Sequence, residues 1–143
     1  MRIFALLITI VFSLYSSETV AQQLGYYSDY KTALSVAQKE QKPLILVVVT
    51  SYCPWCRKLE RKSLASPVID QYIKAHFISL IVDRNKDADR FPKIFQTPRI
   101  PTVFYIDPDS TKAYWETVGY LSKSEFSESI HDAQKIFEQR DLK

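Results

Sequence analysis

Cysteine and histidine, the usual ligands of structural zinc, are scarce in this chain of 143 residues. The sequence holds two cysteines, Cys53 and Cys56, and two histidines, His76 and His131. A structural zinc site takes about four such ligands, and both histidines lie far from the cysteine pair in the sequence. The composition therefore disfavours a structural zinc site, and we expect neither a metal nor a cofactor.

The N-terminal apolar run is not long enough to cross a bilayer. Residues 3–11, with Phe12 and Leu14, form a stretch that is apolar apart from Thr9, and it has the length of a signal-peptide core and not of a membrane span. Thr19 and Ala21 then occupy the small-residue positions before a cleavage site. We expect a signal peptide over residues 1–21 and one domain over residues 22–143, in the periplasm or secreted. An uncleaved N-terminal anchor is the alternative, and it also places the domain outside the cytoplasm.

A strong excess of one charge is absent as well, because 19 basic residues face 16 acidic ones and leave a net charge of +3. The densest basic pairs are Arg57-Lys58 and Arg61-Lys62, and Glu60 lies between them. This pattern is typical of a solvated helix face and not of a nucleic-acid footprint. We therefore expect no nucleic-acid partner.

The two cysteines form a CPWC motif, residues 53–56, at a predicted junction between a strand and a helix. Residues 44–49 are a continuous, mostly β-branched apolar run, which is typical of a buried strand. Residues 57–64 continue at helical spacing, and Pro54 suits a first helical turn. The unpaired amides of that turn and the helix dipole would stabilise a thiolate on Cys53.

A thiolate is the form of cysteine that attacks disulfides. Cys56 lies three residues after Cys53, so its sulfur can close a short ring and release the partner from a mixed disulfide. The motif therefore predicts Cys53 as the attacking and Cys56 as the resolving catalytic residue. Alternatives are an inert structural disulfide, which gains little from so small a loop, and a protein that holds a metal or a client through the dithiol without catalysis.

The rest of the chain predicts alternating strands and helices within one domain. Strands are expected over residues 44–49, 77–82, 102–106 and 113–118. Helices are expected after a cap at Ser28 or Asp29, after the cysteines, from Ser66, and after a cap at Ser122 or Ser124. A loop is expected over residues 83–90, followed by one helical turn over residues 93–96.

Three features in this order resemble the thioredoxin-like superfamily over nearly all of residues 22–143: the CPWC motif, Ile100-Pro101-Thr102 before a strand, and residues 118–122 before the last helix. The resemblance implies an α/β thioredoxin fold, with a central mixed sheet flanked by helices. Within the superfamily, residues 42–44 and 66–69 and Glu60 are most similar to the C-terminal periplasmic domain of the DsbD thiol reductase and its free-standing relatives.

The resemblance also implies that Pro101 follows a cis peptide bond and faces Cys53. A proline tolerates a cis bond far better than other residues do, and it interrupts strand pairing locally. The backbone of Ile100 can then pair with an extended client segment. The alternative is that Pro101 only starts a strand. Trp55, beside the thiols, is expected to contribute to client docking, with simple packing as its alternative.

The chain departs from many thioredoxins in one position, because Val47 replaces the buried acid six residues before the attacking cysteine. The remaining candidate is Glu60, four residues after Cys56 and on the same helical face. DsbD-like domains resemble this chain in having an acid there, and such a carboxylate can accept the Cys56 proton. The alternative, to which the sequence gives the same weight, is a solvated Glu60 that pairs with a basic neighbour such as Arg57.

We therefore predict a monomeric, secreted thiol-disulfide oxidoreductase that reduces protein disulfides. Its partners would be protein thiols or disulfides, and its electrons would come from a membrane donor of the DsbD type. Ile100 before the proline and the DsbD-like flanking residues favour reduction. A disulfide oxidase or isomerase is the alternative.

Overall fold

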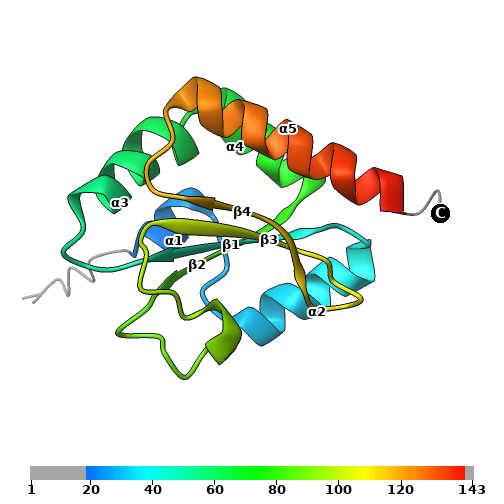
Figure 1. Cartoon of the computed structure of the whole chain (residues 1–143), viewed down its shortest axis with the longest axis horizontal. Helices are drawn as coiled ribbons and strands as arrows, with labels where there is room; N and C mark the ends of the chain where they lie inside the picture. The colour runs from blue at the N-terminus through cyan, green and yellow to red at the C-terminus, as the bar shows by residue number, and fades with distance from the viewer. Residues whose placement is uncertain (1–18, 141–143) are drawn as a thin grey trace, which may run out of the picture.

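The computed structural model describes residues 19–140 of the chain (Figure 1). The strands are β1 (Leu44–Val49), β2 (Ile78–Asp83), β3 (Thr102–Ile106) and β4 (Ala113–Val118). The α-helices are α1 (Val20–Leu24), α2 (Tyr30–Glu40), α3 (Pro54–Leu59), α4 (Pro67–His76) and α5 (Lys123–Arg140). A π-helix, η1 (Glu60–Leu64), follows α3, and a 3₁₀-helix, η2 (Lys93–Phe95), precedes β3.

The predicted signal peptide, residues 1–21, lies outside the described residues except for its last three. Across residues 19–140, no helix combines the length and the hydrophobicity that a membrane span requires.

The four strands form one mixed sheet in the order β2-β1-β3-β4. β1 is parallel to β2 and antiparallel to β3, and β4 is antiparallel to β3. Val47, in the middle of β1, pairs with Ile81 on one side and Val103 on the other. All six residues of β1 are buried, which explains why its sequence is apolar at every position and does not alternate.

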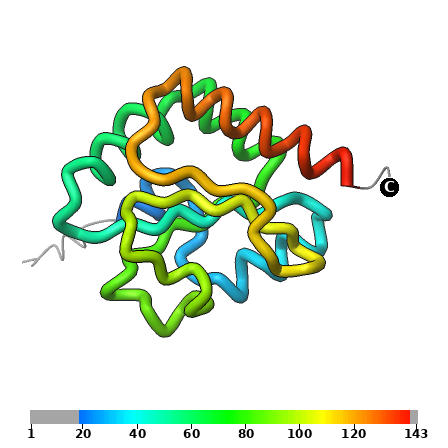
Figure 2. The backbone as a smooth tube through the Cα atoms, in the orientation of Figure 1, coloured from blue at the N-terminus to red at the C-terminus, as the bar shows by residue number. Residues whose placement is uncertain are grey.

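Helices cover both faces of the sheet (Figures 1 and 2). One face packs its apolar side chains against α1, α3, η1, α4 and α5, in a cluster that includes both cysteines. The other face packs against α2 and the segment around η2. The structure is therefore the α/β thioredoxin fold, with the mixed central sheet that the resemblance implied.

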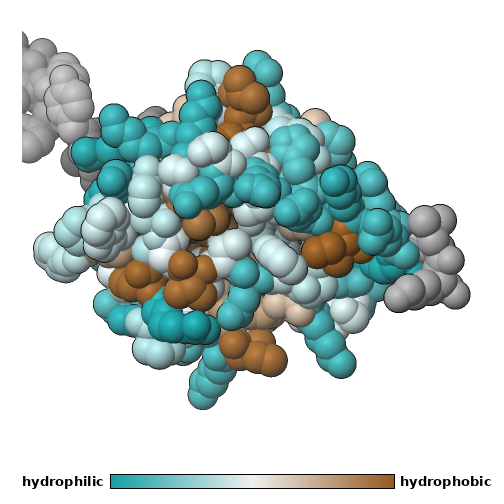
Figure 3. Space-filling view, turned by 45° about the horizontal axis from the view of Figure 1, so that its top comes forward, coloured by the Kyte–Doolittle hydropathy of each residue, from teal (hydrophilic) through white to brown (hydrophobic). Residues whose placement is uncertain are grey.

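The outer surface of the molecule is mostly hydrophilic on the face that Figure 3 shows, with small and separate hydrophobic patches. Such scattered patches are ordinary for a folded domain and do not indicate a binding site.

Two predicted helix caps are found at the start of α2 and of α5. Asp29, and not Ser28, caps α2, because its carboxylate accepts the Thr32 amide at 2.8 Å. At α5, the Ser122 hydroxyl accepts the Glu125 amide at 3.4 Å, and the Glu125 carboxylate accepts the Ser122 amide at 2.8 Å. This reciprocal pair is a capping box, which fixes where α5 begins.

The helix predicted over residues 57–64 is present, but its second half has a different hydrogen-bond pattern. The Ala65 amide donates to the Glu60 carbonyl five residues earlier, at 2.9 Å, so η1 is a π-helix. Single π turns are rare and often occur at functional sites. Helix α1 was not predicted either, because its first two residues, Val20 and Ala21, were assigned to the end of the signal peptide.

Candidate active site

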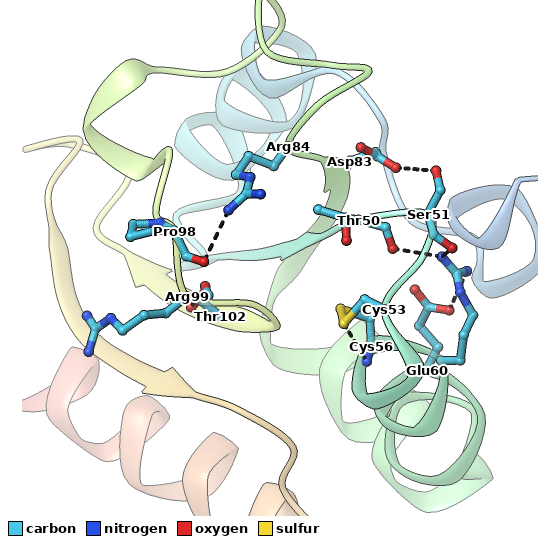
Figure 4. Close-up of a disulfide and its surroundings, with 11 residues drawn as sticks. Thr50, Ser51, Cys53, Cys56, Glu60, Asp83, Arg84, Pro98, Arg99 and Thr102 are labelled. Carbon is cyan, nitrogen blue, oxygen red and sulfur yellow. Dashed lines mark hydrogen bonds and ion pairs between the residues drawn. A yellow bond between two sulfur atoms is a disulfide. The ribbon is translucent and has the colours of Figure 1, made fainter.

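The two cysteines form a disulfide at the start of α3 (Figure 4). Cys53 is the N-cap residue with an extended backbone, and Pro54 is the first helical residue. The Cys56 amide donates to the Cys53 sulfur at 3.1 Å. Cys53 retains 8% of its exposure, whereas Cys56 is fully buried. Of the two cysteines, Cys53 is therefore the more accessible to a partner.

The amide that contacts the Cys53 sulfur has a clear chemical consequence for the reduced protein. It is one of the unpaired N–H groups of a helix start, where the helix dipole is positive. Both effects stabilise a negatively charged sulfur on Cys53. Cys56 lies deeper in the hydrophobic cluster, where burial disfavours a thiolate.

Arg57 connects the loop before the cysteines to the helix after them. Its guanidinium donates to the carbonyls of Thr50 at 3.1 Å and Ser51 at 3.4 Å, and to the Glu60 carboxylate at 2.9 Å. The Ser51 hydroxyl also donates to the Asp83 carboxylate at 2.6 Å, as Figure 4 shows. The loop that positions Cys53 is therefore held by side chains from both α3 and β2.

Glu60 lies in η1 with only 4% of its surface exposed, and its carboxylate points toward the loop of Thr50 and Ser51 (Figure 4). Among the described residues, its second oxygen, Oε1, has no hydrogen-bond partner. Burial raises the pKa of Glu60 above its ordinary value, although the charges of Arg57 and Arg61 oppose that shift. The alternative of a solvated Glu60 is therefore wrong in its exposure, while the expected pairing with Arg57 is found.

A cavity of about 460 Å³ lies between α1 and the ends of β1 and β2. Glu60 and Arg57 are among its lining residues, together with Asp83 and Arg90, whereas neither cysteine is.

The strand position six residues before Cys53 holds Val47, which is fully buried in β1. This position therefore supplies no carboxylate. Among the described residues, Glu60 is thus the buried acid of the α3–η1 segment.

The peptide bond between Ile100 and Pro101 is cis, which confirms that prediction. Pro101 is buried, and β3 begins at the next residue. The Arg84 guanidinium donates to the carbonyls of Thr97 and Pro98, both at 3.1 Å, and its side chain points toward Pro98 in Figure 4. Arg84, directly after β2, therefore holds the loop that leads to the cis-proline.

Trp55 is 57% exposed. Its ring lies 5.8 Å from the ring of Tyr120, and the Lys58 ammonium lies over both rings, at 5.1 and 4.5 Å from their centroids. Tyr52 is 99% exposed in the loop before Cys53. The position of Lys58 three residues after Trp55 could have been noticed in the sequence. Tyr120 and Arg84 could not, because they reach the site from distant parts of the sequence only when the chain folds.

A dithiol that caps the helix after a central strand, on a mixed sheet with a cis-proline before β3, defines the class of thioredoxin-fold dithiol proteins. The chain belongs to the thioredoxin-like domain family, which it matches over residues 30–134. It carries the Cys53–Cys56 disulfide within that domain.

One curated relative is spermatogenesis-associated protein 20 of Rattus norvegicus, which is 32% identical over 74 residues. The match covers 52% of this chain and 9% of that relative, so the chain matches a small part of a much longer protein.

Two solved structures share the fold. A thioredoxin from Thermus thermophilus has a TM-score of 0.66 and 18% identity, over 75% of this chain and 85% of its own. The oxidised C-terminal domain of DsbD from Neisseria meningitidis has a TM-score of 0.58 and 21% identity, over 76% of this chain and 98% of its own. At these identities the likeness shows the fold alone.

Proposed function

We propose that the protein is a thiol-disulfide oxidoreductase that reduces protein disulfides. The observation that carries the proposal is the asymmetric disulfide at the start of α3. The sulfur of Cys53 accepts a helix amide and the residue keeps 8% of its surface exposed, whereas Cys56 is fully buried. One sulfur is therefore suited to attack a client, and the other to release it.

The reaction begins with the reduced protein. The Cys53 thiolate attacks one sulfur of a client disulfide, the client S–S bond breaks, and a mixed disulfide forms between Cys53 and the client. The first client sulfur leaves as a thiolate and takes a proton from solvent. Cys56 then loses its proton, and its sulfur attacks that of Cys53. The second client sulfur leaves, and two electrons have passed from the dithiol to the client.

Glu60 is the proposed acceptor of the Cys56 proton, because it is the buried acid of the same helical segment. Trp55 and the backbone of Ile100 are the proposed client contacts. Trp55 is exposed beside the disulfide, and Ile100 precedes the cis-proline without a backbone partner among the described residues. A free backbone of this kind can pair with an extended segment.

The proposed setting is the periplasm or another secreted location, where a membrane dithiol donor of the DsbD type returns two electrons to the disulfide. The predicted signal peptide, the DsbD-like residues of the sequence and Ile100 before the proline support this direction. An equilibrium potential near that of thioredoxin, about −270 mV, would support a reductase. A value near about −120 mV, as in a strong oxidase, would contradict it.

The experiment that tests the function compares the reduced full chain with Cys53→Ser and Cys56→Ser on a peptide disulfide. The Cys53 variant should show no exchange above the uncatalysed rate. The Cys56 variant should accumulate a mixed disulfide through Cys53, detectable by mass spectrometry. Faster alkylation of Cys56 than of Cys53 at mildly acid pH would overturn these roles, and no exchange by the unsubstituted protein would overturn the function.

A further inference from the structure

The surface beside the disulfide carries three aromatic rings and one lysine. We define it as the aromatic–lysine surface, made of Tyr52, Trp55, Lys58 and Tyr120. We propose that this surface selects client segments that carry carboxylate side chains next to their disulfide. The inference rests on the proposed function, since it names the class of client that the same dithiol would reduce.

The position of the lysine is the first observation. The Lys58 ammonium lies within about 6 Å of the centroids of both rings, Trp55 and Tyr120, which is the range of a cation–π interaction. Such an interaction holds the charge in place without neutralising it, because the rings carry no net charge. The three N–H donors of the ammonium can therefore still bind an anion.

Hydrogen bonds attach the surface to the rest of the site. The buried Ser63 hydroxyl, in η1, donates to the Leu121 carbonyl at 2.8 Å, next to Tyr120. The Gly119 amide donates to the Pro101 carbonyl at 2.8 Å. The connection that carries Tyr120 is therefore tied both to the helix of the dithiol and to the cis-proline. A client that reaches Cys53 along this loop would meet the aromatic–lysine surface in a fixed position.

The charge of the surrounding helix is the second observation. The α3–η1 segment holds four basic residues and one acidic residue, a net charge of +3 that equals the net charge of the whole chain. The acidic residue, Glu60, is buried and paired with Arg57. Lys58, Arg61 and Lys62 are exposed, and no ion pair is found for them in residues 19–140. The exposed charge of the α3–η1 segment is therefore of one sign.

These two observations favour an acidic client over the other possible occupants. The exposed rings of Trp55 and Tyr52 can cover the apolar stems of an extended segment, and a carboxylate beside its cysteine would reach Lys58 with a charge-assisted hydrogen bond. A basic segment would be repelled by Lys58 and Arg61, and a neutral one would leave the ammonium without a partner. Exposed charges at an interface change the association rate and its salt dependence more than they change the affinity.

The test uses three peptide disulfides that differ only in the two residues flanking each cysteine, which are glutamate, glutamine or lysine. Reduction by the pre-reduced full chain is followed in single turnovers, and the second-order rate constant is compared at low and high salt. We expect the glutamate peptide to be reduced about fivefold faster than the glutamine peptide at low ionic strength. The lysine peptide should be slowest, and about 1 M salt should remove most of the difference.

Substitutions then locate the selection. Lys58→Gln should bring the ratio between glutamate and glutamine peptides close to one, whereas Lys58→Arg should preserve it. Lys39→Gln removes the same charge from α2, on the opposite face of the sheet, and should leave the ratio of the unsubstituted protein unchanged.

Equal rates on all three peptides, or an unchanged ratio in Lys58→Gln, would overturn the inference while the proposed function stands. Failure to reduce any of the peptides would overturn the proposed function itself. If the unsubstituted protein sedimented as a dimer and Lys58→Glu as a monomer, a second copy of the chain would cover this surface. The inference would again be wrong.

Discussion

At the level of single residues, the two carboxylate oxygens of Glu60 have different surroundings. Its Oε2 atom binds Arg57, and Arg57 holds the carbonyls of Thr50 and Ser51 before the dithiol. Its Oε1 atom is buried without a partner among the described residues. One oxygen thus orders the loop, and the other remains available to accept a proton. Sequence spacing predicted the helical face of Glu60, but it could not predict the burial.

We predict that Glu60→Gln slows the resolution of the mixed disulfide and leaves the first attack by Cys53 nearly unchanged. Cys53 is already stabilised by a helix amide, whereas Cys56 must lose a proton as it attacks. Burial raises the pKa of Glu60, so only its ionised form, which becomes populated as the pH rises, can act as a base. The resolution rate of the unsubstituted protein should therefore increase with pH through that range, and that of the variant should not.

Single-turnover kinetics from about pH 4 to 8 would separate the two steps, because the mixed disulfide accumulates before it resolves. Arg57→Gln is the informative control, since it removes the contacts to the loop and keeps the carboxylate. If Arg57→Gln reproduced the pH profile of Glu60→Gln, Glu60 would act only through Arg57. In that case it would be a positioning residue.

At the level of the elements, the sequence predicted what depends on local pattern and missed what depends on distant contacts. The buried strand β1 was predicted because its apolar run is continuous, and α5 because Phe126 and Ile130 repeat at helical spacing. The π-helix η1 was not predicted, because the helix propensity of residues 57–64 does not distinguish hydrogen bonds to the fourth preceding residue from bonds to the fifth. The arginine that holds the cis-proline loop was also missed, because Arg84 and Pro98 meet only in the folded chain.

This contact leads to a prediction for Arg84→Gln. The substitution removes a charged donor from the carbonyls of Thr97 and Pro98, and hydrogen bonds from charged groups contribute about 1.5–3 kcal/mol. The loop that carries Ile100 should then be less well ordered before a client binds. We expect KM for a peptide disulfide to rise about three- to tenfold. This rise is smaller than the full hydrogen-bond free energy would give, because Arg84 is partly exposed and solvent weakens its contacts.

The alkylation rate of Cys53 should change little in Arg84→Gln, which would separate loop ordering from thiol activation. Arg90→Gln is a matched control, because Arg90 lies in the same connection and its side chain pairs only loosely with Asp87, at 3.7 Å. A similar rise in KM for both variants would indicate a general effect of positive charge, and the prediction would be wrong.

At the level of the whole molecule, the two hydrophobic clusters on either side of the sheet are linked at the site, because Ile100 packs against both. The cluster on the dithiol face also encloses polar tyrosine groups. Tyr105, on β3, shares a hydrogen bond of 2.9 Å with Ser129 on α5, so it joins the sheet to the last helix. Tyr26 is buried in the same cluster, and among the described residues its hydroxyl has no partner.

Tyr26, Tyr105 and the partly buried Tyr114 on β4, which packs against the same cluster, make the stability of the fold sensitive to alkaline pH. Burial raises the pKa of Tyr26, Tyr105 and Tyr114 well above the ordinary value of 10.0. Above pH 10 the unfolded chain loses these protons while the folded protein keeps them, so the folded state binds more protons and the free energy of unfolding falls. Three such groups give a slope of about −4 kcal/mol per pH unit, and the stability they provide is complete below pH 10.

Tyr26→Phe tests this prediction without removing a hydrogen bond that the described residues make. Urea unfolding of the oxidised protein, measured between about pH 8 and 11.5, should give a slope that is less steep by about 1.4 kcal/mol per pH unit in the variant. Near neutral pH the variant should be at least as stable as the unsubstituted protein, because burial of an unpaired hydroxyl is unfavourable. Tyr52→Phe is the control, since its ring is exposed in both states. An unchanged slope in Tyr26→Phe would mean that the hydroxyl loses its proton as readily in the folded protein as in the unfolded chain, and that the dithiol face of the sheet admits water as far as Tyr26.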